Sequence, residues 1–167
     1  GSQVDIKGSS IQEKFNDALR MLVEHTYKHL LLILDFIEDE KELKSYLVSS
    51  HDQVTLDSHG ISHPNKEAID MVDEFIRMQS ELNNQIRIKP LYDRFSHAPY
   101  GWRELDIAKI IAELLKEQRI RIRYNAEYLD PEKDVNTLMT VFTKIREADK
   151  AIVTVRQKVD EHLIRSV

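Results

Sequence analysis

Apolar side chains recur at steps of three and four residues from Ile11 to Ile37, the spacing of one face of an α-helix. No Pro or Gly interrupts this span, so we expect one continuous helix, the alternative being two helices broken near Thr26 and Tyr27. Ser10-Ile-Gln-Glu13 matches a capping box and predicts that the helix begins at Ser10. The apolar positions are Ile11, Phe15, Leu19, Leu22, Val23, Leu30, Leu31, Leu34 and Ile37.

Two shorter helices are predicted next. Asp39-Glu-Lys-Glu42 opens one, because acidic groups suit the positive end of a helix dipole. Asn65 is the expected cap of the other, which ends at Asn83-Asn84. The polar stretch from His51 to Pro64 contains a Gly and a Pro and is predicted to be a loop. These helices predict a bundle over residues 9–84, preceded by a tag or linker at residues 1–8.

A different pattern begins at Ile86-Arg-Ile-Lys89, which alternates and predicts a short strand. Pro90 suits the first turn of a short helix that follows. Ala98-Pro-Tyr-Gly-Trp102 is predicted to be a turn, because proline restricts the residue before it to an extended conformation. A broad apolar stripe then predicts a helix from about Arg103 to Glu117.

The clearest strand runs from Arg119 to Tyr124, where isoleucines and arginines alternate and so face opposite sides. Asn125-Ala126 is a plausible hairpin turn, since Asn tolerates positive φ, and Glu127-Tyr-Leu129 is the return strand. A helix from about Asp134 to Lys144, a β-branched strand at Ala151–Val155 and a helical tail follow. The predicted fold class is mainly α, with a helical bundle followed by a winged-helix-like α+β module at residues 85–167 that carries a small β-hairpin.

The composition, with 41% hydrophobic and 32% charged residues, is that of a folded globular protein. The chain has no Cys, which excludes disulfides, Cys-zinc sites and Cys nucleophiles. It has no apolar run of about 18 residues, so we expect no membrane span and a cytoplasmic location. Residues 1–83 hold 8 Lys and Arg against 16 Asp and Glu, whereas residues 84–167 hold 16 against 13. This asymmetry suggests two subdomains, but the positive charge is weaker than that of a dedicated DNA-binding domain.

The basic side chains around the predicted hairpin are the candidate nucleic-acid-binding residues: Lys116, Arg119, Arg121 and Arg123. On a wing, each would contact a phosphate and add salt-sensitive affinity. The alternative is the solvated face of an edge strand, where charges discourage aggregation. Acidic neighbours such as Glu113 and Glu127 would weaken the positive potential.

Pro99-Tyr100-Gly101-Trp102 is the most distinctive short string. Tyr and Trp make rigid anchors at recognition surfaces. We favour a structural motif, in which Trp102 packs over the junction of two helices and Gly101 permits the turn, because large aromatic side chains are usually buried.

Other combinations of polar residues do not predict a reactive site. Three histidines, His51, His59 and His63, share a loop with Asp52 and Asp57, but Gly60 and Pro64 prevent a preformed pair on one helix face, and we expect no metal. His97, Asp93 and Ser96 resemble a triad in composition only. Neither Gly-x-x-x-x-Gly-Lys-[Ser/Thr] nor Gly-x-Gly-x-x-Gly occurs. We therefore expect no cofactor and no enzymatic activity from this chain alone.

Four strings carry a family resemblance: Lys89-Pro-Leu-Tyr-Asp-Arg-Phe95, Ala98-Pro-Tyr-Gly-Trp102, Asp106-Ile-Ala-Lys-Ile-Ile-Ala-Glu-Leu114 and Gln118-Arg-Ile-Arg-Ile-Arg-Tyr124. Through them the chain resembles the large P-loop ATPases of bacterial BREX phage-defence systems, the BrxC-like and PglY-like proteins. The resemblance implies a fragment of a multidomain ATPase whose nucleotide site lies elsewhere in the parent protein.

The leading hypothesis is therefore an accessory module of a phage-defence ATPase, used for assembly or DNA contact. The expected partners are other domains of the parent protein, other defence-system proteins and, in the DNA-contact form of the hypothesis, double-stranded DNA, with no membrane. The alternatives are a purely structural protein–protein interaction module and a winged-helix transcription regulator, which would require a specific operator and usually a dimer.

Overall fold

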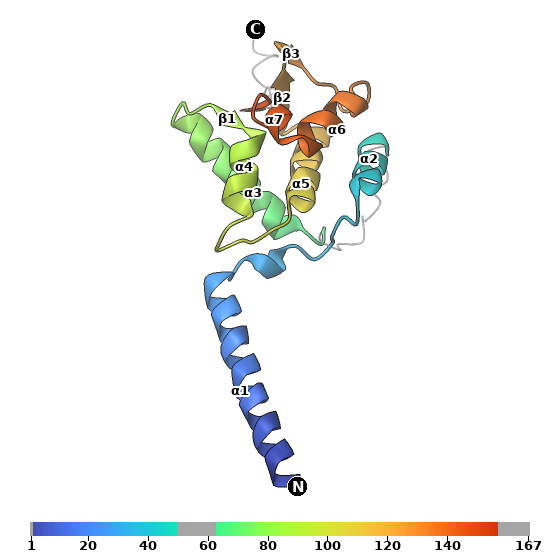
Figure 1. The fold of residues 1–167 in the computed structure, drawn as a ribbon. Coiled ribbons are helices and arrows are strands. Elements are labelled where there is room, and N and C mark those ends of the chain that lie inside the picture. The colour runs from blue at the N-terminus through green and yellow to red at the C-terminus, as the bar shows by residue number, and fades with distance from the viewer. Residues whose placement is uncertain (1, 50–62, 157–167) are drawn as a thin grey trace.

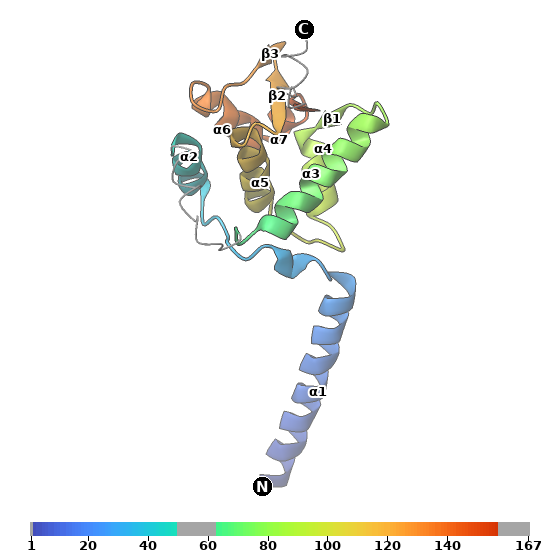
Figure 2. The same ribbon diagram turned by 180° about the vertical axis from the view of Figure 1, so that it is seen from behind.

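The computed structural model describes residues 2–49 and 63–156 (Figure 1). Helix α1, Ser2–Thr26, projects away from the rest of the described structure in both views (Figures 1 and 2). The prediction of one continuous helix to Ile37 is wrong, because α1 ends at Thr26. The two-helix alternative places the break correctly, but no second α-helix occupies residues 27–37. The predicted start is wrong too. Ser10 lies inside α1, where its neighbours' N–H groups already have helical partners, so it cannot cap the helix.

The segment after α1 contains only one short 3₁₀ turn, η1, Leu30–Leu32, and is extended at Ile33. Hydrogen bonds from distant parts of the chain explain this extended conformation. Asn65 Oδ1 accepts hydrogen bonds from the backbone N of Leu34 at 2.8 Å and of Asp35 at 2.9 Å. Asp106 Oδ1 accepts from the backbone N of Ile37 at 2.9 Å. These N–H groups would bond within a helix, and here they are satisfied by buried side chains instead.

Four further helices form most of the body. Helix α2, Glu40–Val48, begins at Asp39, whose side chain accepts from the backbone N of Glu42 at 2.9 Å. Helix α3, Lys66–Glu81, begins after Asn65 as predicted, although Asn65 makes no side-chain cap bond. Helix α4, Ile88–Phe95, has Pro90 in its first turn, and helix α5, Glu104–Lys116, follows the Pro-Tyr-Gly-Trp turn.

The described strands form one antiparallel sheet in the order β1-β4-β2-β3. Asn125 and Ala126 both have positive φ, 51° and 65°, and form the tight turn between β2 and β3 that the sequence predicts. Two helices, α6 and α7, lie in the connection between β3 and β4, and the sequence did not predict the second. The bounds are β1 Ile86–Arg87, β2 Ile120–Tyr124, β3 Glu127–Tyr128, α6 Val135–Thr143, α7 Ile145–Ala148 and β4 Ile152–Val155.

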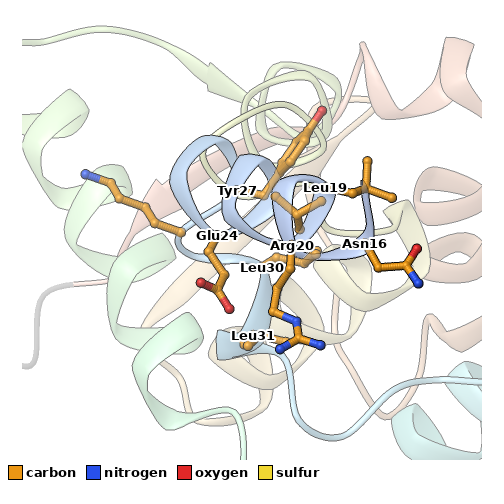
Figure 3. Close-up of a pocket in the computed structure, with 9 residues that line it drawn as sticks. Asn16, Leu19, Arg20, Glu24, Tyr27, Leu30 and Leu31 are labelled. Carbon is orange, nitrogen blue, oxygen red and sulfur yellow. The ribbon is translucent and has the colours of Figure 1, made fainter. Parts of the chain in front are cut away.

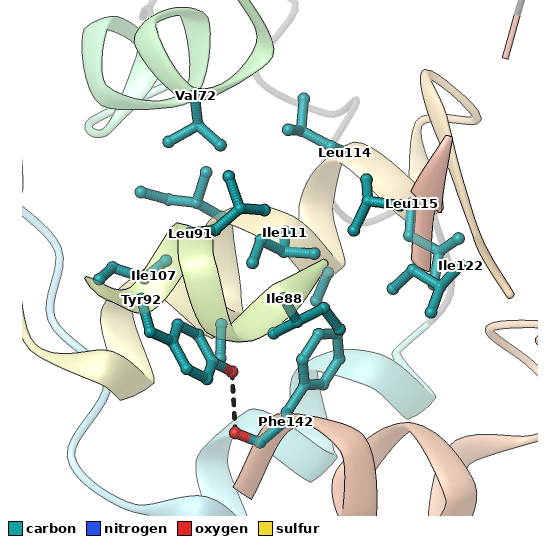
Figure 4. Packing of buried hydrophobic residues seen from close by; sticks show 14 of the residues in the cluster. Val72, Ile88, Leu91, Tyr92, Ile107, Ile111, Leu114, Leu115, Ile122 and Phe142 are labelled. Atoms are coloured by element: carbon teal, nitrogen blue, oxygen red, sulfur yellow. Dashed lines mark hydrogen bonds between the residues drawn. The ribbon is translucent and has the colours of Figure 1, made fainter. Parts of the chain in front are cut away.

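One hydrophobic core joins the helices to the inner face of the sheet, which carries Ile120, Ile122 and Val153 (Figure 4). Tyr92 is buried in it and donates a hydrogen bond from its hydroxyl to the backbone O of Phe142 at 2.8 Å. The core includes residues on both sides of position 84, among them Ile76 and Ile86. Whether the two parts fold independently stays a prediction.

The fold class is mainly helical with a small antiparallel sheet, as the sequence predicts. The predicted loop at residues 51–62 and the predicted helical tail from residue 159 lie outside the described residues. Within the described residues, no helix is both long enough and apolar enough to cross a bilayer.

Candidate functional site

Helix α5 occupies the position of the recognition helix in a winged helix. The order α3, β1, α4, α5, β2 and then β4 places it as the second helix of the helix-turn-helix, directly before the sheet hairpin. In a DNA-reading domain this helix lies in the major groove. Here every residue from Asp106 to Leu115 is buried, because α2, α3, α4 and α6 all pack against α5. In this arrangement, α5 has no free face to insert into DNA.

Buried charged side chains of α5 bind the segments that cover it. Lys109 Nζ lies 2.7 Å from Asp35 Oδ2, and Glu113 Oε1 lies 2.7 Å from His63 Nε2. Burial, with Glu117 adding repulsion, raises the pKa of Glu113 from 4.5 to about 7, while Lys109 acts in the opposite direction. The buried polar residues Lys109 and Glu113 therefore attach segments that precede α5 in the chain.

Lys116 and Arg119, two of the candidate nucleic-acid-binding residues, have partners within the domain. Lys116 Nζ donates to the backbone O of Tyr46 at 2.6 Å and of Ser49 at 2.8 Å, which closes the C-terminal end of α2. Arg119 Nη2 lies 2.7 Å from Asp73 Oδ2 on α3. Lys116 thus links α5 to α2, and Arg119 links the turn before β2 to α3, so both cations are occupied.

Arg121 and Arg123 are exposed, on the outward face of β2. Strand pairing adds residues that the linear sequence does not bring together. Arg123 is opposite Tyr128 on β3 and Ile152 on β4, and Ile152 is opposite Arg87 on β1. The guanidinium of Arg121 lies 5.3 Å from the centre of the Tyr128 ring. Only the sheet register could have placed Arg87 and Tyr128 in this group.

Trp102, in the Pro-Tyr-Gly-Trp motif, is 2% exposed and stacks on Phe95 with ring centres 5.3 Å apart. Its indole Nε1 donates to the backbone O of His29 at 2.9 Å. The backbone N of His29 donates to the backbone O of Pro99 at 3.0 Å, and the His29 ring stacks on Tyr100. The motif thus binds the chain just after α1 through both backbone groups of one residue.

Gly101 completes this anchor. Its φ of +71° is in the left-handed region that favours glycine. A Cβ at this position would lie 2.8 Å from Cδ1 of Tyr27, so the ring of Tyr27 rests directly on the glycine. The Pro-Tyr-Gly-Trp turn therefore sets where α1 leaves the body.

Helix α1 carries a stripe of exposed apolar residues, defined here as Ile11, Phe15, Leu19, Leu22 and Val23. Ile11 is 69% exposed and Phe15 66%. The side chains of Glu13, Asp17 and Glu24 fall on the opposite side of a 3.6-residue turn. A hollow of about 490 Å³ lies where the stripe meets η1, with Leu19, Tyr27 and Leu31 in its lining (Figure 3). Contiguous exposed apolar surface is uncommon on soluble monomeric proteins.

The remaining sequence candidates form no reactive site in the described structure. No group of three metal-ligating side chains occurs among residues 2–49 and 63–156, and His51, Asp52, Asp57 and His59 lie outside them. His97 Nδ1 faces the backbone O of Asp93, whose carboxylate instead binds Lys89 at 3.0 Å. The geometry of a triad is therefore not present at His97.

Comparison with known proteins gives one family match. A family described as the BREX ATP-binding protein BrxC winged helix-turn-helix domain matches residues 29–157. The match begins at His29, the residue bound by the Pro-Tyr-Gly-Trp motif, and it includes every described strand. No solved structure matches the chain.

Proposed function

The chain belongs to the family of BREX ATP-binding protein BrxC winged helix-turn-helix domains and is a module of a BREX phage-defence ATPase, and from this we propose that it serves assembly. In this proposal the apolar stripe of α1 packs against another domain of the parent protein or another defence-system protein. The exposed stripe is the observation that carries the proposal.

The amount of apolar surface on α1 supports this role. Residues of the stripe expose between 38% and 69% of their surface, and they share one face of a single helix. An isolated helix gains most of its stability in a protein by packing its apolar face. Covering each large side chain of the stripe is worth about 1–3 kcal/mol. A helix in this state gains stability by docking.

The fixed attachment of α1 to the body also supports a role in assembly. His29 is held through its backbone N and O, and Gly101 fits under Tyr27 without room for a Cβ. A helix whose exit from the body is set in advance loses less conformational freedom when it docks. The domain would present α1 to its partner in a defined direction.

The buried α5 favours this proposal over a winged-helix transcription regulator. Such a regulator reads base edges with exposed side chains near the start of its recognition helix. Asp106, in the first turn of α5, is 2% exposed and is bonded to Arg103 and Ile37. We also propose that ATP binding belongs to other parts of the parent protein, since neither phosphate-binding motif occurs in this chain.

Site-specific crosslinking in the full-length parent ATPase tests the proposal. A photoreactive phenylalanine analogue replaces Leu19, in cells that contain the complete defence system, and crosslinked products are identified by mass spectrometry. We expect a crosslink to one defined surface of the parent protein or of a defence component. Phe15→Glu/Leu22→Glu should reduce its yield at least tenfold, because two buried charges without partners prevent docking.

Glu13→Lys/Asp17→Lys is the matched control, with two charge changes on the opposite face of α1. It should leave the crosslink within twofold of the wild-type yield. An undiminished crosslink in Phe15→Glu/Leu22→Glu, or crosslinks scattered over many proteins, would contradict the assembly role of the stripe.

A further inference from the structure

We propose that the outward face of the sheet binds the phosphodiester backbone of a nucleic acid, independently of α5 and of the assembly surface on α1. The face is built from two rows of side chains that run across the strands. The first row is Arg87, Ile152, Arg123 and Tyr128, and the second is Thr154 and Arg121.

The spacing of this face suits an extended anionic chain. Arg87 and Arg123 flank Ile152, so their backbones lie two strand spacings apart, about 10 Å. Arg121 is two residues from Arg123 on the same side of β2, about 7 Å along the strand. Three arginines therefore share one face of the sheet, and each guanidinium has the planar fork that binds phosphate through two parallel hydrogen bonds.

The arginines of β2 are available for such a ligand. Among the described residues, no ion pair and no hydrogen bond involves the side chain of Arg121 or Arg123. Arg87 Nη1 donates a hydrogen bond to the backbone O of Asp149 at 3.4 Å and lies 3.8 Å from the half-exposed carboxylate of the same residue, so both of its contacts are long. This differs from Lys116 and Arg119, whose charges are used inside the domain. Arg121 and Arg123 therefore give the sheet face two exposed guanidinium groups that form no ion pair within the described residues.

A polar hollow beside the arginines favours nucleic acid over a simple anion. It has a volume of about 380 Å³, and its lining includes Asn83, Asn84, Arg123, Tyr128 and Thr154. Side-chain amides donate to and accept from base edges, and an exposed tyrosine supplies a stacking surface. Tyr128 is 53% exposed, which leaves its ring accessible from solvent. The hollow can thus receive a base while the arginines bind the adjoining phosphates.

Fluorescence anisotropy with labelled DNA tests this inference. The full chain is titrated against a 20-nucleotide single strand and the corresponding duplex, over a series of salt concentrations, with a Glu-rich peptide of equal charge as a third ligand. We expect DNA binding tighter than about 100 µM, the weak end of non-specific binding. Arg121→Glu/Arg123→Glu should weaken DNA binding at least tenfold. It should also make the fall of the logarithm of the association constant with the logarithm of salt concentration less steep, by about one to two in slope.

Tyr128→Ala distinguishes the two forms of DNA. If the ring stacks on an unpaired base, this variant weakens single-strand binding several-fold and leaves duplex binding within twofold. Equal weakening of both forms would still support the surface, with Tyr128 positioning Arg121 instead.

Lys41→Glu/Lys44→Glu, on the exposed side of α2, is the matched control for net charge and should stay within twofold of wild type. Arg121→Gln/Arg123→Gln repeats the test without charge reversal, and circular dichroism confirms that each variant is folded. The inference is overturned if neither DNA binds, if the Glu-rich peptide binds as tightly as DNA, or if the control loses as much affinity as the arginine variants.

Discussion

At the scale of single residues, Glu113 is a carboxyl group whose pKa the fold raises to near neutral pH. It lies in α5, is 2% exposed, and has its pKa raised from 4.5 to about 7 by burial. Because the folded state then binds a proton more tightly than the unfolded state, this proton stabilises the fold. The contribution is fully present below pH 4.5 and is lost as the pH rises through about 7.

We therefore expect the free energy of unfolding of the wild type to fall, relative to that of Glu113→Gln, as the pH rises from about 5 to about 8. The relative loss should be about 1–3 kcal/mol. Urea unfolding of both proteins at the two pH values measures it. Glu81→Gln, at an exposed site, is the control and should follow the wild type. Parallel pH profiles for wild type and Glu113→Gln would refute the prediction.

Among the candidate nucleic-acid-binding residues, the alternation of β2 correctly predicted that Arg121 faces away from the core. It could not predict that Lys116 and Arg119 have partners, because those partners, Tyr46 and Asp73, come from distant parts of the chain. For the same reason, the sequence could not predict that Arg87 and Tyr128 lie beside Arg121 and Arg123, because strand pairing alone brings them together. Nucleic-acid binding by any of these residues stays a prediction.

At the scale of elements, the turn at Gly101 connects two of the main features of the molecule, α1 and the aromatic cluster around Trp102. We expect Gly101→Ala to destabilise the domain by about 1–3 kcal/mol, because it combines an unfavourable φ with a contact too short for Cβ. Thermal unfolding measures the loss.

Ser10→Ala, at an exposed position within α1, is the control, since alanine has a higher helix propensity than serine. It should leave the melting temperature unchanged or raise it slightly. If Gly101→Ala is as stable as the wild type, the close packing of Tyr27 on the turn is wrong.

The local pattern of apolar and polar residues was sufficient to predict those elements whose partners are close in sequence. The β2–β3 hairpin and α5 follow from alternation, from an asparagine at the turn and from a broad apolar stripe. It failed for residues 27–38, where Ile33 and Ile37 keep helical spacing but are buried from an extended chain. Their conformation depends on Asn65 and Asp106, which no local signal could connect to them.

At the scale of the whole molecule, the chain has the element order of a winged helix. Its recognition helix, α5, is covered by other elements, whereas the long helix α1 is exposed. Asn65, Asp106, Lys109 and Lys116 bind the segments around α2 and the 3₁₀ turn to the body. The consequence is a domain whose recognition helix is buried beneath its own chain. Helix α1 projects from the body (Figure 1) and carries exposed apolar side chains. Assembly through α1 is our central claim.

Hydrogen–deuterium exchange tests this claim most directly, by comparing the isolated domain with the assembled full-length parent protein. In the isolated domain, backbone amides of residues 10–26 should exchange much faster than those of α5, since exchange follows local opening. In the assembled protein, residues 10–26 should become protected at least tenfold, and added DNA should leave α5 unchanged. Continued fast exchange of α1 after assembly, or a change in α5 on DNA binding, would contradict the account.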